Sequence, residues 1–175
     1  MRIAIVNSQN IHIKELERFL PEDTAEIFGE GEGEASRLAG EYALAKGIKF
    51  TECLPEYEKY GRDAPFKRYE AMIEKADLVL AFWDGLSKEI QLVLGECAKR
   101  GIAVRMFLSV DEGEFLELEP KHAQVFGLLA QTAKREGKSI AKMSAGEMSP
   151  RELLRLIRAV IKARGISRPD PEERR

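Results

Sequence analysis

The sequence predicts an α/β fold, a Rossmann-like three-layer sandwich with a mostly parallel five-stranded sheet, followed by a helical extension. Short apolar runs alternate with helix-forming stretches throughout residues 2–109, which is the order of a parallel sheet covered by helices. The run LVLAFW at 78–83 is apolar throughout, as is typical of a strand buried on both faces. After Ser109 the alternation stops, and a basic, helix-rich sequence follows.

Each expected strand is a short apolar run that ends in polar or turn-forming residues. The first begins with RIAIV, close to the start of the chain, and the last is IAVRMFLS. The five expected strands cover residues 2–8, 25–29, 48–55, 77–85 and 102–109.

The stretches between the strands carry helix signals. Residues 11–21 have apolar side chains at helical spacing and end at a proline. Residues 34–47 are rich in good helix formers and end at Gly47. A further helix opens with Ser87 as N-cap and has Glu89 in its first turn. The expected helices cover residues 11–21, 34–47, 67–76 and 87–101, and residues 56–66 are expected to form a polar, aromatic loop.

The last third of the chain has a different pattern. Residues 110–120 are acidic and predict a loop, and 121–138 predict a helix. Ser149, Pro150 and Glu152 form a capping box at the start of the clearest helix of the chain. The expected organisation is a domain at 1–109, a helical extension at 110–165 and a disordered tail at 166–175.

Charge is distributed unevenly over the 175 residues. Residues 1–120 carry 15 Lys/Arg and 24 Asp/Glu, a net charge of −9, whereas residues 121–175 carry 13 and 6, a net charge of +7. One interpretation is that the two parts attract each other within one chain or between chains, which favours a homo-oligomer. The other is that the basic part contacts nucleic acid or another anionic partner, although no aromatic residues interleave its charges.

Membrane insertion and metal binding have no signature in the sequence. The apolar runs are too short to cross a bilayer, and no signal-peptide pattern opens the chain, so a cytoplasmic protein without membrane contact is expected. His12 and His122 lie in unrelated segments, and Cys53 and Cys97 lack a paired spacing. We therefore predict no metal site and reduced cysteines.

In an open α/β sheet the ligand site lies at the carboxyl ends of the strands. This rule brings together four polar segments, with Tyr57, Tyr60 and Trp83 as candidate aromatic walls. Asp84 in the WDG turn is a candidate catalytic carboxylate, but an Asp-Gly after a strand is more often a turn. The four segments are residues 7–10, 29–36, 54–62 and 83–89.

Several motifs resemble a YspA-like domain of the SLOG superfamily, a group that includes the LOG nucleotide phosphoribohydrolases and the DNA-processing protein DprA. KADLVLAFWDGLSKEIQLVLGECAKRGIAVRMF at 75–107 is similar to the family's strand followed by F-W-D-G-x-S-x-G-T. RIAIVNSQN resembles its first strand and G-S-R turn, GEGEGEASRLAGEYALAKGI its S-G-G-A-R-G-A-D segment, and EYEKYGRDAPFKRYEAMIEKAD its K-Y-G…R-N segment. The resemblance covers residues 1–108 and implies a nucleotide-binding fold.

The chain departs from this pattern where the family holds phosphate. The arginine of G-S-R is Gln9, the arginine of the glycine loop is Gly33, and G-T after the DGxS turn is Glu89-Ile90. The family's catalytic glutamate falls on Val93. Because carboxylates replace cationic and small groups, we expect phosphate to be repelled by roughly 1 kcal/mol per close pair in water.

The glycine loop at 29–36 allows three interpretations: a solvated acidic turn without ligand, a carboxylate site for Ca²⁺ or Mg²⁺, or a site for a nucleoside-like or cationic ligand. The leading prediction is a non-catalytic, ligand-sensing or nucleotide-derivative-binding protein. Alternatives are an N-glycosidic hydrolase with relocated carboxylates, Asp84 and Glu89 being the candidates, and an assembly or nucleic-acid-binding protein that works through its basic C-terminal helix. The predicted ligand-binding residues are Asn7, Ser8, Gln9, Gly29, Glu30, Gly31, Tyr60, Arg68, Trp83, Asp84, Gly85, Ser87 and Lys88.

Overall fold

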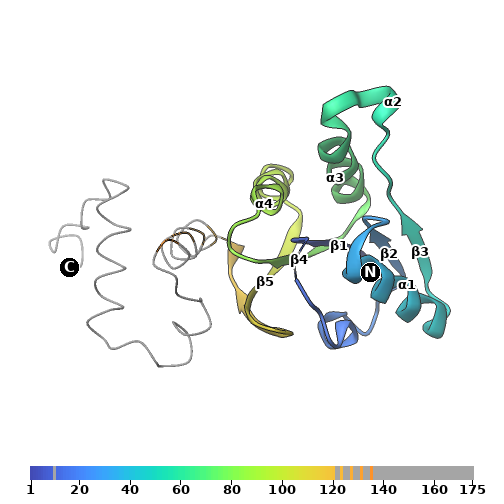
Figure 1. Cartoon of the computed structure of the whole chain (residues 1–175). Coiled ribbons are helices and arrows are strands. Elements are labelled where there is room, and N and C mark those ends of the chain that lie inside the picture. Colours follow the sequence, from blue (N-terminus) through green and yellow to red (C-terminus); the bar gives the residue numbers. More distant parts are fainter. Residues whose placement is uncertain (10, 121–122, 124–126, 128–130, 132–134, 136–175) are drawn as a thin grey trace, which may run out of the picture. The chain divides into compact units, whose positions relative to one another are not determined.

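A computed structural model describes residues 1–9, 11–120, 123, 127, 131 and 135. The fold is α/β, with one mostly parallel sheet (Figure 1). Contacts divide the chain into two units, Met1–Ala123 and Gln124–Arg175, and the sheet belongs to the first. The helices predicted after residue 120 and the predicted tail lie outside the described residues.

The sheet has six strands in the order β3-β2-β1-β4-β5-β6. The first five strands pair in parallel, so crossovers run outward in both directions from β1. β1 and β4 are neighbours in the sheet, and the direction in which successive strands are added reverses between them. Sheets of this kind usually bind ligands at such a switch point. The strands are β1 (Arg2–Asn7), β2 (Glu26–Gly29), β3 (Lys49–Glu52), β4 (Leu78–Trp83), β5 (Ala103–Asp111) and β6 (Glu114–Leu118).

Helices cover both faces of the sheet (Figure 1). The helix α1 packs on β1, β2 and β3, whereas α3 and α4 pack against each other on the opposite face. The α-helices are α1 (Gly33–Lys46), α2 (Tyr57–Tyr60), α3 (Ala64–Lys75) and α4 (Lys88–Arg100), and the 3-10 helices are η1 (Leu16–Phe19) and η2 (Gly61–Asp63).

The core follows from the alternation of side chains along the central strands. Ile3 and Ile5 of β1 point toward α1, where Ala35, Ala39 and Ala43 form a buried stripe at helical spacing. These small side chains let α1 lie close to the sheet. The helix ends at Gly47, as predicted, with a left-handed φ of 66°.

The prediction of a full helix over 11–21 was wrong, because only the short η1 forms there. Ile11 and Ile13 are both buried. Side chains two positions apart point the same way in an extended segment, whereas on a helix they are rotated by about 200° around the axis. Burying both therefore favours the extended form.

The predicted loop at 56–66 was also wrong in part, since it contains α2, η2 and the first turn of α3. Pro65 lies in that first turn, where its fixed φ suits a helix start. The helix therefore begins three residues earlier than expected.

The largest correction concerns residues 110–120, which were expected to form a loop and belong to the extension. They form a β-hairpin instead, since β6 pairs antiparallel with β5, so the sheet has six strands rather than five. Gly113 makes the turn with a φ of 74°. Phe115 then packs edge-on against Phe82, with ring centroids 5.3 Å apart. This contact anchors β6 to the core.

Candidate functional site

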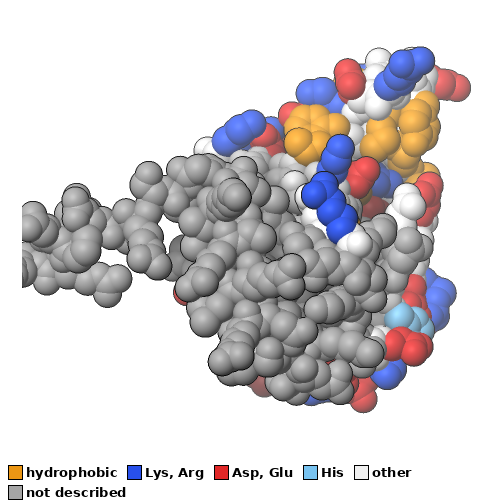
Figure 2. Space-filling model, turned by 60° about the vertical axis from the view of Figure 1, so that its left-hand side comes forward, with side chains coloured by type: hydrophobic (Ala, Val, Ile, Leu, Met, Phe, Trp, Pro, Cys, Tyr) orange, Lys and Arg blue, Asp and Glu red, His pale blue; other side chains and the backbone are white. Residues whose placement is uncertain are grey.

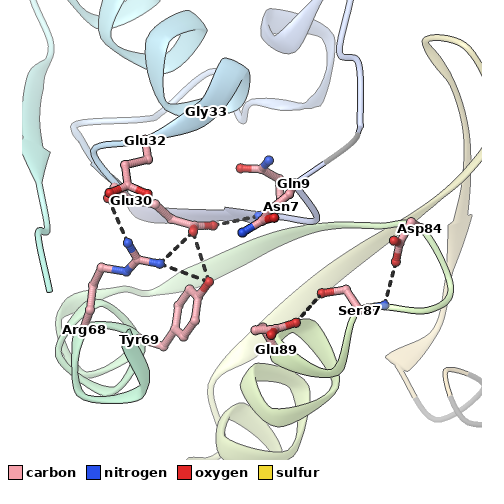
Figure 3. A pocket seen from close by; sticks show the side chains of 10 residues that line it. All are labelled: Asn7, Gln9, Glu30, Glu32, Gly33, Arg68, Tyr69, Asp84, Ser87 and Glu89. Atoms are coloured by element: carbon pink, nitrogen blue, oxygen red, sulfur yellow. Dashed lines mark hydrogen bonds and ion pairs between the residues drawn. The ribbon is translucent and has the colours of Figure 1, made fainter. Parts of the chain in front are cut away.

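A pocket of about 390 Å³ opens at the carboxyl ends of β1, β2 and β4 (Figure 3). This volume is at the small end of the range of about 300–1,000 Å³ for small-molecule sites. Residues from the β1, β2 and β4 ends meet there with two from α3. The lining residues are Asn7, Gln9, Glu30, Glu32, Gly33, Arg68, Tyr69, Asp84, Ser87 and Glu89.

Glu30 is the most buried carboxylate of the pocket, with 7% of the residue exposed. One oxygen accepts a hydrogen bond from the backbone N–H of Asn7 at 2.9 Å. The other accepts from Arg68 Nη2 and from the Tyr69 hydroxyl, each at 3.0 Å (Figure 3). Both oxygens are therefore occupied by groups that lie far away in the sequence.

Arg68 is buried equally well, with 7% of its side chain exposed. Its Nη1 donates to the backbone carbonyl of Glu30 at 3.2 Å, and its Nη2 donates also to the Tyr69 hydroxyl at 3.2 Å. The remaining nitrogen, Nε, is the one buried side-chain N or O atom without a hydrogen-bond partner in the described part of the chain. The guanidinium is thus anchored on one edge only.

Burial is the main cause of the shifted pKa values of Glu30 and Tyr69. Burial raises the pKa of Glu30, and the Asn7 N–H and the Arg68 charge act in the opposite direction. Burial, followed by the neighbouring Glu30 carboxylate, raises the pKa of Tyr69 far above its usual value. The phenol therefore stays protonated at neutral pH and remains a hydrogen-bond donor to Glu30.

The three glutamates that alternate with glycine in the β2–α1 loop have three different surroundings. Glu30 points into the pocket floor, Glu32 is exposed and lines the pocket, and Glu34 pairs with His12 Nδ1 at 2.6 Å, outside the pocket lining. Glycine is required between them at Gly31, because its φ is 76° and a Cβ there would lie 2.4 Å from the Leu54 side chain. The loop is therefore not uniformly solvated.

On the opposite side of the pocket, Asp84 organises the turn that leads into α4. Its Oδ1 accepts hydrogen bonds from the N–H groups of Leu86 at 2.8 Å and Ser87 at 2.7 Å. The Ser8 hydroxyl donates to the same oxygen at 3.1 Å. The structure thus gives Asp84 the turn-forming contacts that an Asp-Gly after a strand suggests.

Glu89 is the more accessible carboxylate on this side. It is exposed in the first turn of α4, and one of its oxygens accepts a hydrogen bond from Ser87 Oγ at 2.9 Å. Ser87 occupies the predicted N-cap position, but its side chain makes no cap hydrogen bond because the hydroxyl is directed to Glu89. Figure 3 shows the Glu89 carboxylate directed toward the pocket.

The predicted aromatic walls lie outside the pocket lining. Trp83 is fully buried, and its indole N–H donates to the Ser87 carbonyl at 3.0 Å. Tyr57 is 61% exposed on α2, at the end of the molecule where Figure 2 shows hydrophobic side chains at the surface. Tyr60 follows on the same helix, with the Lys59 ammonium 4.7 Å from its ring centroid. The aromatic residue that does line the pocket is Tyr69, which directly follows Arg68 on the predicted helix and was missed.

The other predicted binding residues have supporting positions. Ser8 is buried beneath the pocket and bonded to Asp84, whereas Lys88 is exposed at the start of α4. Gly29 is buried, and a Cβ there would lie 2.6 Å from Ser36 Oγ. That hydroxyl accepts the Gly31 N–H at 3.0 Å, which closes the loop. Gly85 is buried in the Asp84 turn with a φ of 79°.

Among the described residues, the pocket therefore contains four carboxylates and one guanidinium, and that guanidinium is already paired. Within the described residues, no three His, Cys, Asp or Glu side chains are grouped as metal ligands. Val93, which the motif resemblance predicted to stand in place of a catalytic glutamate, is fully buried. Glu96, one turn further along α4, is held by Arg100 at 2.7 Å and Lys99 at 3.3 Å.

Comparisons with protein-family models, with curated proteins and with solved structures found no match for this chain. Among the residues that the structure describes, there is no helix with the length and apolar character needed to span a membrane. Cys53 and Cys97 are free thiols, and burial raises the pKa of Cys97 to about 11.

Proposed function

We propose that this protein is a non-catalytic binding protein for a small nucleoside-like ligand that carries no phosphate. The ligand is uncharged or cationic and occupies the pocket at the carboxyl ends of β1, β2 and β4. We also propose that residues 1–108 form a Rossmann-like domain related to the SLOG superfamily. This relationship is supported by the doubly wound strand order and by the motifs of the sequence.

The observation that carries the proposal is the pairing of Arg68, the one cation among the described residues that line the pocket. Its guanidinium lies 3.0 Å from the Glu30 carboxylate, and both side chains are more than nine-tenths buried. Glu32 and Glu89 contribute further negative charge at exposed positions. A phosphate would meet these carboxylates without a free cation, whereas ribose hydroxyls or amino groups would donate hydrogen bonds to them.

Catalysis is not part of the proposal, because the candidate catalytic carboxylate Asp84 is committed to structural contacts. Asp84 holds the turn before α4 through two backbone N–H groups and Ser8. The hydrolase alternative requires Asp84 or Glu89 to act on the anomeric carbon. It predicts that Asp84→Asn or Glu89→Gln abolishes release of a nucleobase from a nucleotide. Homo-oligomer formation and a role for the basic C-terminal helix remain predictions on residues outside those described.

The test is calorimetric titration of the full chain with adenosine, guanosine, cytidine and uridine, each compared with its 5′-monophosphate. We expect at least one nucleoside to bind at least tenfold more tightly than its monophosphate. Glu32→Gln and Glu89→Gln should each weaken nucleoside binding. Glu58→Gln is the matched control, since Glu58 is exposed on α2 outside the pocket lining. Tighter binding of the monophosphates, or no binding of any nucleoside, would contradict the proposal.

A further inference from the structure

Two helices begin at the edge of this pocket. The N-cap of α1 is Glu32 and that of α4 is Ser87, and neither side chain makes a cap hydrogen bond. Gly33 and Ser87 line the pocket. Helix N-termini at the carboxyl edge of a parallel sheet present N–H groups and a positive dipole end, which favour an oxyanion. The local architecture therefore suits an anion better than the carboxylate content of the pocket suggests.

A second observation at the pocket floor also points to an anion. Arg68 is more than nine-tenths buried, its guanidinium is directed into the pocket, and its Nε lacks a hydrogen-bond partner (Figure 3). A buried guanidinium normally uses its donors on a carboxylate or a phosphate, often two at a time. Here Nε is left without an acceptor, so the partner that is present does not satisfy the whole guanidinium.

The partner that is present belongs to the protein itself. The Glu30 carboxylate receives the Asn7 N–H at 2.9 Å, Arg68 Nη2 at 3.0 Å and the Tyr69 hydroxyl at 3.0 Å. A backbone N–H, a guanidinium and a hydroxyl form the kind of donor set that binds phosphate oxygens. These donors come from β1 and α3, and Glu30 itself follows β2.

We infer that Asn7 N–H, Arg68 and Tyr69 form an oxyanion subsite, and that the Glu30 carboxylate occupies it and makes the pocket reject phosphate. Glu30 is then the specificity-determining residue of the pocket. This inference rests on the proposed function, since it explains why the preferred ligand carries no phosphate. It is nevertheless testable without any nucleoside.

The inference predicts that removal of the Glu30 side chain creates a phosphate site. Glu30→Ala removes both the charge and the volume of the carboxylate, so an oxygen of inorganic phosphate takes its place against Arg68. Glu30→Gln removes the charge but keeps the volume of the side chain. It should therefore bind phosphate more weakly than Glu30→Ala does. Glu58→Ala is the control, because Glu58 is an exposed carboxylate on α2 outside the pocket lining.

The experiment is a thermal melt of each full-length variant in increasing sodium phosphate, with sodium chloride to keep ionic strength constant. In phosphate at about ten times its Kd, Glu30→Ala should melt about 3–8 °C higher than in chloride. The wild-type protein and Glu58→Ala should show no such difference. The double variant Glu30→Ala with Arg68→Met should lose the response, because Arg68 supplies the charge.

Three results would overturn the inference. One is a phosphate response of equal size in Glu58→Ala, and another is a response that survives in the double variant. The third is a failure of both Glu30→Ala and Glu30→Gln to respond, including the case in which Glu30→Ala does not fold in phosphate. A phosphate response in Glu30→Ala together with no nucleoside binding by the wild-type protein would keep the subsite and refute the proposed ligand class.

Discussion

Two acidic turns face each other across the pocket, and they use their carboxylates differently. In the loop before α1, Glu30 is buried and bonded to residues 23 to 39 positions away. In the turn before α4, Asp84 is bonded to N–H groups two and three positions away, and Glu89 is exposed. The first turn is held by tertiary contacts and the second mainly by local ones.

This difference separates structural carboxylates from available ones. Glu30 fixes the floor of the pocket, because its carboxylate bonds Asn7, Arg68 and Tyr69 in a place that water hardly reaches. Glu89 contributes little to stability but keeps an oxygen accessible to a ligand. The negative charge of the pocket is therefore divided between a fixed part and a part that can bind.

The largest expected effect comes from breaking the buried pair on one side. Arg68→Met should lower the free energy of unfolding by about 3–5 kcal/mol, because it leaves the Glu30 carboxylate buried without a cation. Urea denaturation measures the loss. The control is Lys67→Met on the same helix, since Lys67 forms an exposed ion pair with Glu70 at 2.6 Å. If the two variants lose equal stability, the Glu30 loop is not held by its tertiary pair.

The next effect concerns the backbone of the same loop. Gly31→Ala should cost about 1–2 kcal/mol, because a side chain is strained at a φ of 76°. The exposed Leu54 side chain can move away from the added Cβ, so the backbone sets the cost. Gly95→Ala in α4 is the opposite case, since nothing lies within 4 Å and helix propensity improves. Denaturation midpoints that fall in both variants would contradict this explanation.

A smaller effect is expected from pH. Because burial raises the pKa of Glu30 above its ordinary value, the folded protein binds this proton more tightly than the unfolded chain does. The resulting stabilisation is present at low pH and is lost as pH rises through the folded pKa. The wild-type protein should therefore gain stability relative to Glu30→Gln as pH falls through the raised pKa toward the ordinary carboxyl range. Carboxylates with lowered pKa values, such as Asp77, are common to both proteins and cancel in the difference.

The smallest effect on stability belongs to the other turn. Glu89→Gln should change the free energy of unfolding by about 0.5 kcal/mol or less, because the side chain is exposed and bonded only to Ser87 Oγ. The same variant should weaken nucleoside binding in the titration described above. A large loss of stability without a change in affinity would show that Glu89, like Glu30, is structural.

Much of the fold was predictable because its signals are local. The strands β1, β2 and β4, the helices α1 and α4 and the Gly47 helix end follow from short apolar runs, helix formers and a glycine stop. The errors arose where tertiary packing decides between local alternatives. β6 is largely exposed and acidic, and it becomes a strand through its pairing with β5 and the packing of Phe115 against the core.

By itself, the sequence determined the α/β class, the edge of the sheet where polar residues gather, and the turn at Asp84, since each depends on neighbours within a few positions. Only the tertiary structure decided which glutamate of the loop is buried, that Arg68 is already paired, and that Tyr69 rather than Trp83 lines the pocket. Those facts depend on contacts between β1, β2 and α3. The geometry of such contacts is determined when the elements pack together. The spacing of residues within one segment of the sequence does not predict it.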